Sequence, residues 1–147
     1  MRAVTPLRNH PMTERTFAII KPDAVKAKHS GKIIDRIEQE GFSIVALKKM
    51  HMTKKQADGF YAVHKGKGFF EELTTFMSSG PVIVMVLEKE HAIQAWRNLM
   101  GTTDPAEAST NTLRKLYGTS KGNNATHGSD AQETAKTEIA FFFPELK

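Results

Sequence analysis

Six consecutive apolar residues, Val82 to Leu87, follow the turn-forming sequence Ser79-Gly80-Pro81. Four of the six are β-branched. A short run of this composition after a turn predicts a strand that is buried on both faces. We therefore expect this strand to lie in the centre of a sheet. The run is far shorter than the roughly 20 apolar residues that span a bilayer, so the sequence predicts a soluble protein.

The rest of the pattern predicts helices and strands that alternate along one compact domain of 147 residues. In chain order, we expect a strand at 16–20, a helix between 30 and 41, a strand at 42–52, a short helix at 53–61, a helix at 69–77, the strand at 82–87, a helix at 93–100 and a terminal helix from about 130 to 143. This order is typical of an α+β sandwich whose helices cover one face of a mainly antiparallel sheet.

Turn and cap residues mark several boundaries. Gly41 suits the left-handed end of the first helix, and Thr53 suits the start of the next. The sequence Ser129-Asp130-Ala131-Gln132 predicts a capping box, in which the serine and glutamine side chains satisfy free backbone amides. Between Gly101 and Ala125 we expect an irregular loop of about 25 residues, a length that is uncommon in compact domains and usually functional.

Cysteine content and charge narrow the chemistry. The chain contains no cysteine, which excludes disulfides, thiolate metal sites and a cysteine nucleophile, and which is consistent with a reducing compartment. The formal net charge is +5, but residues 1–70 carry a net +8 and residues 71–147 a net −3. Either an anionic ligand or a basic soluble surface explains this imbalance, and charge alone does not separate the two.

His127 is the main candidate for a nucleophile. It directly precedes the predicted start of the terminal helix, where free amides and the helix dipole would stabilise a phosphate. Neutral imidazole is abundant and nucleophilic near pH 7, and Gly128 adds no side-chain bulk beside it. The alternative is a structural histidine, because the chain has five others.

Three cations are candidates for binding a polyphosphate. Lys21 ends the first strand, Arg97 lies in the helix at 93–100, and Arg114 lies in the long loop. Guanidinium groups bind phosphate oxygens bidentately and stabilise charge as it moves between donor and acceptor. Taken singly, each cation is more commonly a solvated surface charge.

Four segments resemble the nucleoside diphosphate kinase family. They are TFAIIKPD at 16–23, SGPV at 79–82, GTTDPA at 101–106 and NATHGSD at 124–130, in the family's order and spacing. The resemblance implies a ferredoxin-like βαββαβ sandwich, with a four-stranded antiparallel sheet covered by helices and a long loop before the catalytic histidine. It also implies ping-pong transfer of the γ-phosphate of a nucleoside triphosphate to a nucleoside diphosphate through a phosphohistidine, which maintains the nucleoside triphosphate pools.

The resemblance implies catalytic roles for five residues, which are Lys21, Tyr61, His127, Ser129 and Glu138. His127 matches the nucleophile, and Glu138 matches the carboxylate that orients its ring so that the other ring nitrogen attacks. Ser129 would support that carboxylate, and Tyr61 matches an aromatic residue near the histidine and Lys21. From the residues alone, Glu138 would be a solvated helix position and Tyr61 an ordinary core residue.

The resemblance also implies how nucleotides bind. The matching positions are Lys21, Arg97, Thr103 and Arg114 for phosphates, Phe69 for stacking of the base, and Asn124 for the sugar hydroxyls. Because stacking accepts any base, the expected substrates are nucleoside di- and triphosphates, including ATP, GTP and their deoxy forms. Mg²⁺ is the expected cofactor, carried by the substrate phosphates and not by a metal site of the protein.

The sequence also leads to expectations for the domain limits, the oligomeric state and the location of the protein. Residues 1–11 lack hydrophobic periodicity and contain two prolines, so we expect an appendage, either a tag remnant or an upstream start, before a kinase domain at 12–147. The resemblance implies a homo-oligomer, either a tetramer or a hexamer, of the short bacterial type. We expect a cytoplasmic protein.

The segment at 109–114 lacks the proline and glycine that many family members carry there, and Gly68 stands where proline is common.

A competing hypothesis is a non-catalytic nucleic-acid-binding module, which the basic first half and the ferredoxin-like sheet suggest. Such a module predicts aromatic residues on strands, whereas Tyr61 and Phe69 lie on predicted helices. A degenerate relative that only binds nucleotide is opposed by the presence of the histidine, glutamate and lysine motifs.

Overall fold

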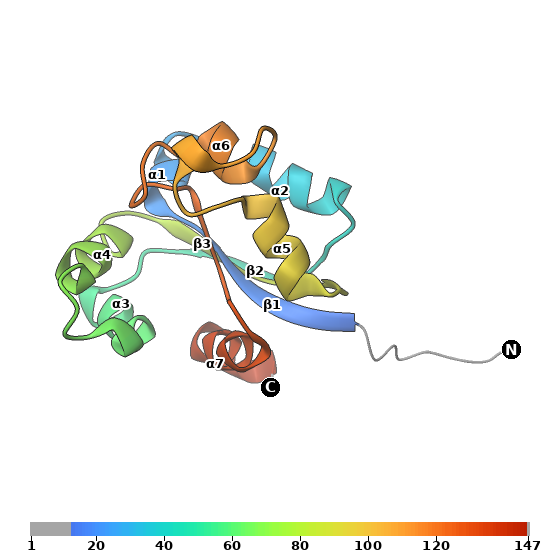
Figure 1. Ribbon diagram of the computed structural model, residues 1–147. Coiled ribbons are helices and arrows are strands. Elements are labelled where there is room, and N and C mark those ends of the chain that lie inside the picture. Colours follow the sequence, from blue (N-terminus) through green and yellow to red (C-terminus); the bar gives the residue numbers. More distant parts are fainter. Residues whose placement is uncertain (1–12, 147) are drawn as a thin grey trace, which may run out of the picture.

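A computed structural model describes residues 13–146, and its centre is a four-stranded antiparallel sheet (Figure 1). The strands are β1 (Thr13–Ile20), β2 (Ser43–Met50), β3 (Val82–Glu90) and β4 (Thr126–Gly128). They lie in the order β2-β3-β1-β4, and each neighbouring pair is antiparallel. The ferredoxin-like fold is therefore confirmed, and β3 is the interior strand that its composition predicts. The expected appendage at 1–11 lies outside the described residues.

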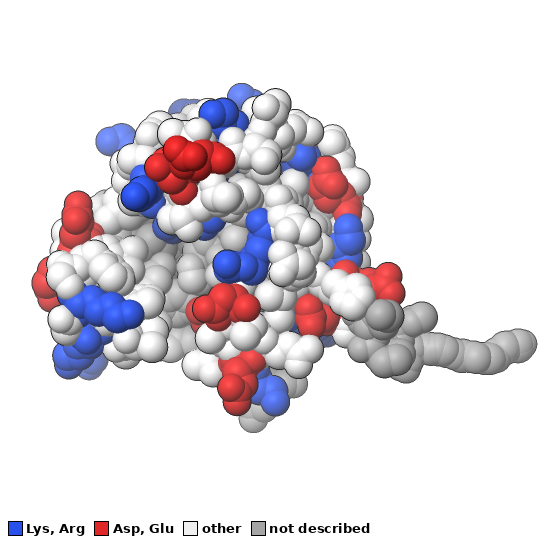
Figure 2. Space-filling view, in the orientation of Figure 1, with Lys and Arg blue, Asp and Glu red and all other residues white. Residues whose placement is uncertain are grey.

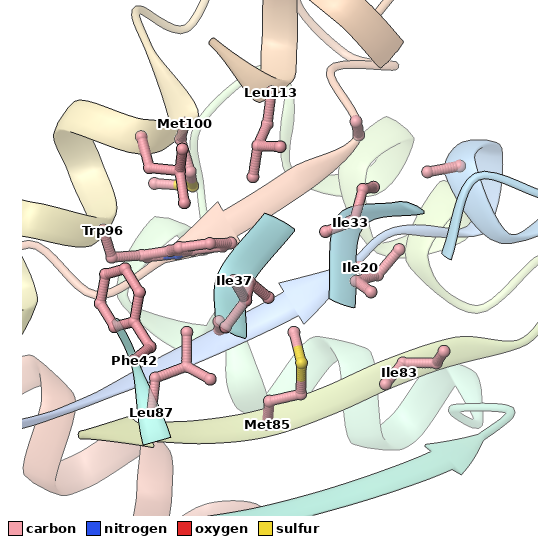
Figure 3. Close-up of a cluster of buried hydrophobic side chains, with 14 of the residues drawn as sticks. Ile20, Ile33, Ile37, Phe42, Ile83, Met85, Leu87, Trp96, Met100 and Leu113 are labelled. Carbon is pink, nitrogen blue, oxygen red and sulfur yellow. The ribbon is translucent and has the colours of Figure 1, made fainter. Parts of the chain in front are cut away.

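Strand β3 is buried on both faces of the sheet, and its side chains alternate between two apolar clusters. Ile83, Met85 and Leu87 belong to the first cluster (Figure 3). The second cluster contains Val82, Val84 and Val86. The prediction that helices cover one face only is wrong. An interior strand with apolar side chains in both directions needs a covering layer on each side.

The helices divide between these two faces. The first face is covered by α2 (Ser30–Gln39) and α5 (Ala92–Met100), which contribute Ile33, Ile37 and Trp96 to the first cluster. The second face is covered by α3 (Lys54–Phe60), α4 (Phe70–Met77) and α7 (Gln132–Phe142). Two short 3-10 turns, Ala62–His64 and Pro144–Leu146, follow α3 and α7. Each predicted helix is observed within a few residues of its expected limits.

The structure confirms the predicted roles of Thr53 and Gly41 at helix ends. The Thr53 hydroxyl caps α3 by accepting a hydrogen bond of 3.0 Å from the Gln56 amide. Gly41 follows the end of α2 with a φ of +92°, the left-handed conformation that glycine adopts without steric cost. None of the helices in residues 13–146 has the length and apolar character that crossing a membrane requires.

The long loop and the exit from β1 contain helices that the sequence pattern does not predict. The Lys21-Pro22-Asp23 exit opens a helix, α1 (Pro22–Lys26), whose proline occupies the first turn. The segment between 101 and 125 holds a 3-10 turn, Pro105–Glu107, and a further helix, α6 (Leu113–Tyr117). Elements of three to five residues are too short to show hydrophobic periodicity, and β4 is missed for the same reason.

The predicted capping box before α7 is also wrong. The residue at the N-cap is Ala131, and the Thr134 hydroxyl instead accepts hydrogen bonds from the amides of Asp130 and Ala131 at 3.2 and 3.0 Å. Ser129 is buried and uses its hydroxyl elsewhere. That use places it in the candidate site.

Candidate active site

His127 lies on β4 and contacts a carboxylate from α7. Its Nε2 is 3.1 Å from Oε1 of Glu138, and the Ser129 hydroxyl donates a hydrogen bond of 2.8 Å to the same oxygen. The side chains of His127 and Glu138 are 18% and 19% exposed, so the pair is largely shielded from water. Because Glu138 holds Nε2, the ring nitrogen that faces away from the carboxylate is Nδ1. The expected contact among these three residues is observed.

The expectation that His127 directly precedes a helix start is wrong. His127 pairs with Ile19 of β1, and α7 begins five residues later, at Gln132. The main-chain oxygen of His127 accepts a hydrogen bond of 3.1 Å from the Trp96 indole. A Cβ on Gly128 would lie 2.6 Å from that indole nitrogen. Gly128 is therefore needed for the close packing of β4 on Trp96.

Aromatic rings surround the His127 imidazole. The ring centroids of Phe60, Tyr61 and Phe17 lie 5.5, 6.0 and 6.3 Å from that of His127, all in edge-on arrangements. Tyr61 is buried, and within the described residues its hydroxyl has no hydrogen-bond partner. Burial, assisted by the Glu138 charge, raises the pKa of Tyr61, which keeps the phenol protonated. The Tyr61 hydroxyl is therefore an uncharged donor without a partner among residues 13–146, in the buried region beside the His127 ring.

Lys21 lies at the end of β1, next to the loop before β4. Its ammonium group donates a hydrogen bond of 2.8 Å to the side-chain oxygen of Asn124, whose amide in turn donates to the main-chain oxygen of Thr103 at 3.1 Å. The lysine is only 8% exposed. Burial, with repulsion from Arg114, lowers the pKa of Lys21 to about 8, and the charge of Asp23 partly opposes this effect. Three of the expected nucleotide-binding residues are thus joined in one hydrogen-bonded series.

Arg97, Thr103 and Arg114 line one cleft with a volume of about 520 Å³. The Arg114 guanidinium is fixed by hydrogen bonds of 3.0 and 2.9 Å to the main-chain oxygens of Gly101 and Thr126. Burial and the nearby Arg97 lower the pKa of Arg114 to about 10. A cleft that places two guanidinium groups close enough to repel each other is suited to an anion.

Figure 2 shows how basic and acidic side chains are distributed on one face of the molecule. On the face drawn in Figure 2, Lys and Arg side chains occur in several separate places, with Asp and Glu between them. That face carries no continuous basic stripe of the kind that follows a nucleic-acid backbone.

Phe69 stands apart from the other candidates. It lies just before α4 and is 48% exposed, with its ring 5.3 Å from that of His64. The His64 ring is also 6.4 Å from Tyr61. The Phe69 ring is therefore about half-exposed and is connected to the aromatic residues around His127 through His64.

The residues of this region that sequence reasoning missed are Phe60, Trp96 and Asp23. Phe60 and Trp96 are apolar residues within predicted helices, and contact with a histidine leaves no pattern in the sequence. Asp23 belongs to the Lys21-Pro22-Asp23 segment, and its Oδ2 accepts a hydrogen bond of 3.1 Å from the Ala125 amide. Its position beside Lys21 was the available signal.

Comparisons with known proteins agree with this geometry. A family model described as nucleoside diphosphate kinase matches residues 14–147. A nucleoside diphosphate kinase from Desulfotalea psychrophila is 60% identical over 134 residues, which are 91% of this chain and 98% of the relative. One from Syntrophotalea carbinolica is 59% identical over 133 residues, covering 90% of this chain and 97% of the relative.

Solved structures of the same family superpose closely. The structure of the Aquifex aeolicus nucleoside diphosphate kinase gives a TM-score of 0.89 at 50% identity, covering 91% of this chain and 97% of that one. A Halobacterium salinarum nucleoside diphosphate kinase in complex with CDP gives a TM-score of 0.85 at 42% identity, covering 88% and 87%. The chain therefore belongs to the nucleoside diphosphate kinase family, enzymes that transfer phosphate between nucleotides.

Proposed function

We propose that the chain transfers the γ-phosphate in two steps through a phosphohistidine on His127. The supporting observation is the contact of Nε2 with Glu138, whose oxygen is in turn held by the Ser129 hydroxyl. A carboxylate in this position fixes the ring orientation and its tautomer and stabilises positive charge on the ring. Nδ1 then attacks the γ-phosphorus, the bond to the β-phosphate oxygen breaks, and the nucleoside diphosphate leaves. The second step reverses this transfer onto a different nucleoside diphosphate.

The cations would stabilise the phosphoryl group during transfer. Phosphoryl transfer depends mainly on positioning and on neutralising charge that spreads over the phosphate oxygens. Arg114 suits this task because two main-chain oxygens already fix its guanidinium, so it need not reorganise on binding. We assign Lys21, Arg97 and Thr103 to the phosphates as well, and the Tyr61 hydroxyl to the region between Lys21 and the histidine.

The proposal also covers the nucleotide base, the sugar and the metal ion. We assign the exposed Phe69 ring to stacking on the base and Asn124 to the sugar hydroxyls, and the CDP bound to the Halobacterium relative supports nucleotide ligands. Kinases of this family need a divalent cation, and we propose Mg²⁺ bound to the substrate phosphates. Within residues 13–146, no three His, Cys, Asp or Glu side chains are grouped to hold a metal. A cytoplasmic homo-oligomer with a kinase domain at 12–147 is also proposed.

The two-step reaction is tested by trapping its intermediate. The protein is incubated with γ-labelled ATP and Mg²⁺ and then chased with an unlabelled nucleoside diphosphate. We expect a labelled protein that is stable in alkali and labile in acid, with the label passing to the added diphosphate. Transfer without any labelled protein would contradict the covalent intermediate.

Glu138→Gln is expected to slow phosphoenzyme formation by about 10- to 100-fold, because the neutral amide no longer stabilises positive charge on the ring. Single-turnover phosphorylation by ATP measures this step directly. Glu133→Gln on the same helix is the matched control, since Glu133 is exposed in the first turn of α7. Equal rates for the two variants would argue against the assigned role.

Lys21 is expected to set an alkaline limit on activity. The charged ammonium that attracts phosphate is the form present below its pKa of about 8. Above that pH, kcat/KM should therefore fall by about tenfold per pH unit. Lys21→Arg, whose guanidinium stays charged, should lack this limb even if its activity is lower. A wild-type profile that stays flat to about pH 9.5 would contradict the assignment.

A further inference from the structure

The segment between Asn124 and Thr126 forms a strained turn next to the candidate nucleophile. The Thr126 amide donates a hydrogen bond of 2.9 Å to the main-chain oxygen of Asn124. Ala125, between them, has a φ of +75°. A three-residue turn with this central φ is rare and unfavourable for a residue that carries a Cβ. Its conformation therefore needs support from outside the turn.

That support comes from the residues that follow β1. The Ala125 amide donates to Oδ2 of Asp23 at 3.1 Å, and the Ala125 oxygen accepts from the Lys21 amide at 2.8 Å. Ala125 is fully buried, so water does not replace either partner. The start of α1 thus holds both polar groups of the strained residue.

The turn controls where the proposed reacting groups point. Asn124, on one side, binds the Lys21 ammonium at 2.8 Å. His127 lies two residues after Ala125, on the other side. If Ala125 moved to an ordinary negative φ, the chain direction between Asn124 and His127 would change.

The environment of the second Asp23 carboxylate oxygen is also unusual. This oxygen, Oδ1, is buried, and no described residue gives it a hydrogen bond. Buried polar atoms without partners are uncommon in native proteins. Burial raises the pKa of Asp23, and hydrogen bonds from backbone amides, that of Ala125 first, together with the Lys21 charge, oppose this effect.

We propose that Asp23 is a positioning residue for phosphoryl transfer, which holds Ala125 in the left-handed turn and thereby aligns Lys21, Asn124 and His127. This inference rests on the proposed function of those residues. Asp23 also acts on Lys21 through its charge. The groups that face the ammonium are Arg114 from α6, Asn124 from the loop and Asp23 from α1, and only Asp23 raises the pKa of Lys21.

Three variants separate the two effects at about pH 6.5, where Lys21 is charged. Asp23→Ala removes the hydrogen bond and should lower kcat/KM by about 100-fold, the typical cost of a misplaced reacting group. Asp23→Asn keeps an acceptor for the Ala125 amide and should lose only a few-fold. Adding Ala125→Gly to Asp23→Ala should recover about tenfold, because glycine adopts the turn without support. Wild-type activity of Asp23→Ala, or no recovery in the double variant, would overturn the proposal.

The charge effect is measured in the pH profile. Both Asp23→Asn and Asp23→Ala should move the alkaline limb to lower pH by about one unit, and Ala125→Gly should not restore it. A limb that stays at the wild-type pH in Asp23→Asn would overturn this part. Asp35→Asn, on the exposed surface of α2, is the control and should change neither the rate nor the limb.

Folding and function are checked separately. Fluorescence of the single tryptophan, the fully buried Trp96, reports whether each variant is folded. If Asp23→Ala does not fold, the double variant with Ala125→Gly should still fold, because glycine adopts the turn without support, and should remain about tenfold less active than the wild type. A double variant that also fails to fold, or that has wild-type activity, would overturn the positioning role. A wild-type protein that forms no phosphoenzyme would overturn the proposed function, whereas a normal wild type with an equally active Asp23→Ala variant would overturn only the role of Asp23.

Discussion

His127→Ala is expected to abolish the phosphoenzyme and to lower kcat on the order of 10⁵-fold, as removal of a covalent nucleophile typically does. Among the histidines in residues 13–146, only His127 contacts a carboxylate. No neighbouring histidine therefore has the support that would let it replace the lost ring. The remaining activity should come from binding and orientation of the two nucleotides, which survive the substitution.

The measurement is the labelling experiment with ATP, repeated on the variant and on a matched control. His51→Ala removes an exposed histidine after β2 and should label normally. Nucleotide binding, followed by equilibrium titration, should be retained in His127→Ala, because the cations and Phe69 are unchanged. Labelled protein that persists in His127→Ala would contradict the assignment of the nucleophile.

Gly128→Ala is expected to have the largest effect on stability, about 3 kcal/mol, the upper end of the usual cost of overpacking. The added Cβ would lie 2.6 Å from the Trp96 indole nitrogen and 2.7 Å from the terminal carbon of Met100. Both side chains are essentially fully buried and cannot move aside without opening the first cluster. Displacing Trp96 would also break its hydrogen bond to His127, so activity should fall together with stability.

Urea unfolding followed by circular dichroism measures this loss. Gly122→Ala is the matched control, because a Cβ at Gly122 meets nothing within 4 Å and its φ is not positive. The control should leave the unfolding midpoint close to that of the wild type. Equal midpoints for the two alanine variants would show that β4 tolerates the extra carbon beside Trp96.

Much of the fold follows from burial patterns within single elements. The run at 82–87 predicts an interior strand because apolar side chains in both directions are typical of strands that are buried on both faces. The isoleucines of α2 and the Thr53 cap are equally local, since each depends on residues within one turn of helix. The short elements α1, α6 and β4 are not predicted because three to five residues are too few for a hydrophobic period to repeat.

For the candidate site, the sequence identifies the proposed nucleophile, but the residues alone do not identify the carboxylate that contacts it. Without cysteine, histidine is the leading covalent nucleophile, and the family resemblance selects His127 from the six histidines. From the residues alone, however, Glu138 is an ordinary helix position. Its contact with His127 depends on how α7 packs against β1, and that packing is visible only in the assembled fold.

The sequence by itself determined the interior strand, the main helices and the types of side chain available for chemistry, because propensity, periodicity and composition act over short distances. The tertiary structure decided which polar groups meet. Lys21 binds Asn124 across 103 residues, and Asp23 binds the amide of Ala125 across 102. A single polar contact between distant segments leaves no periodic trace in either segment. It forms only when the sheet brings the end of β1 beside the loop that precedes β4.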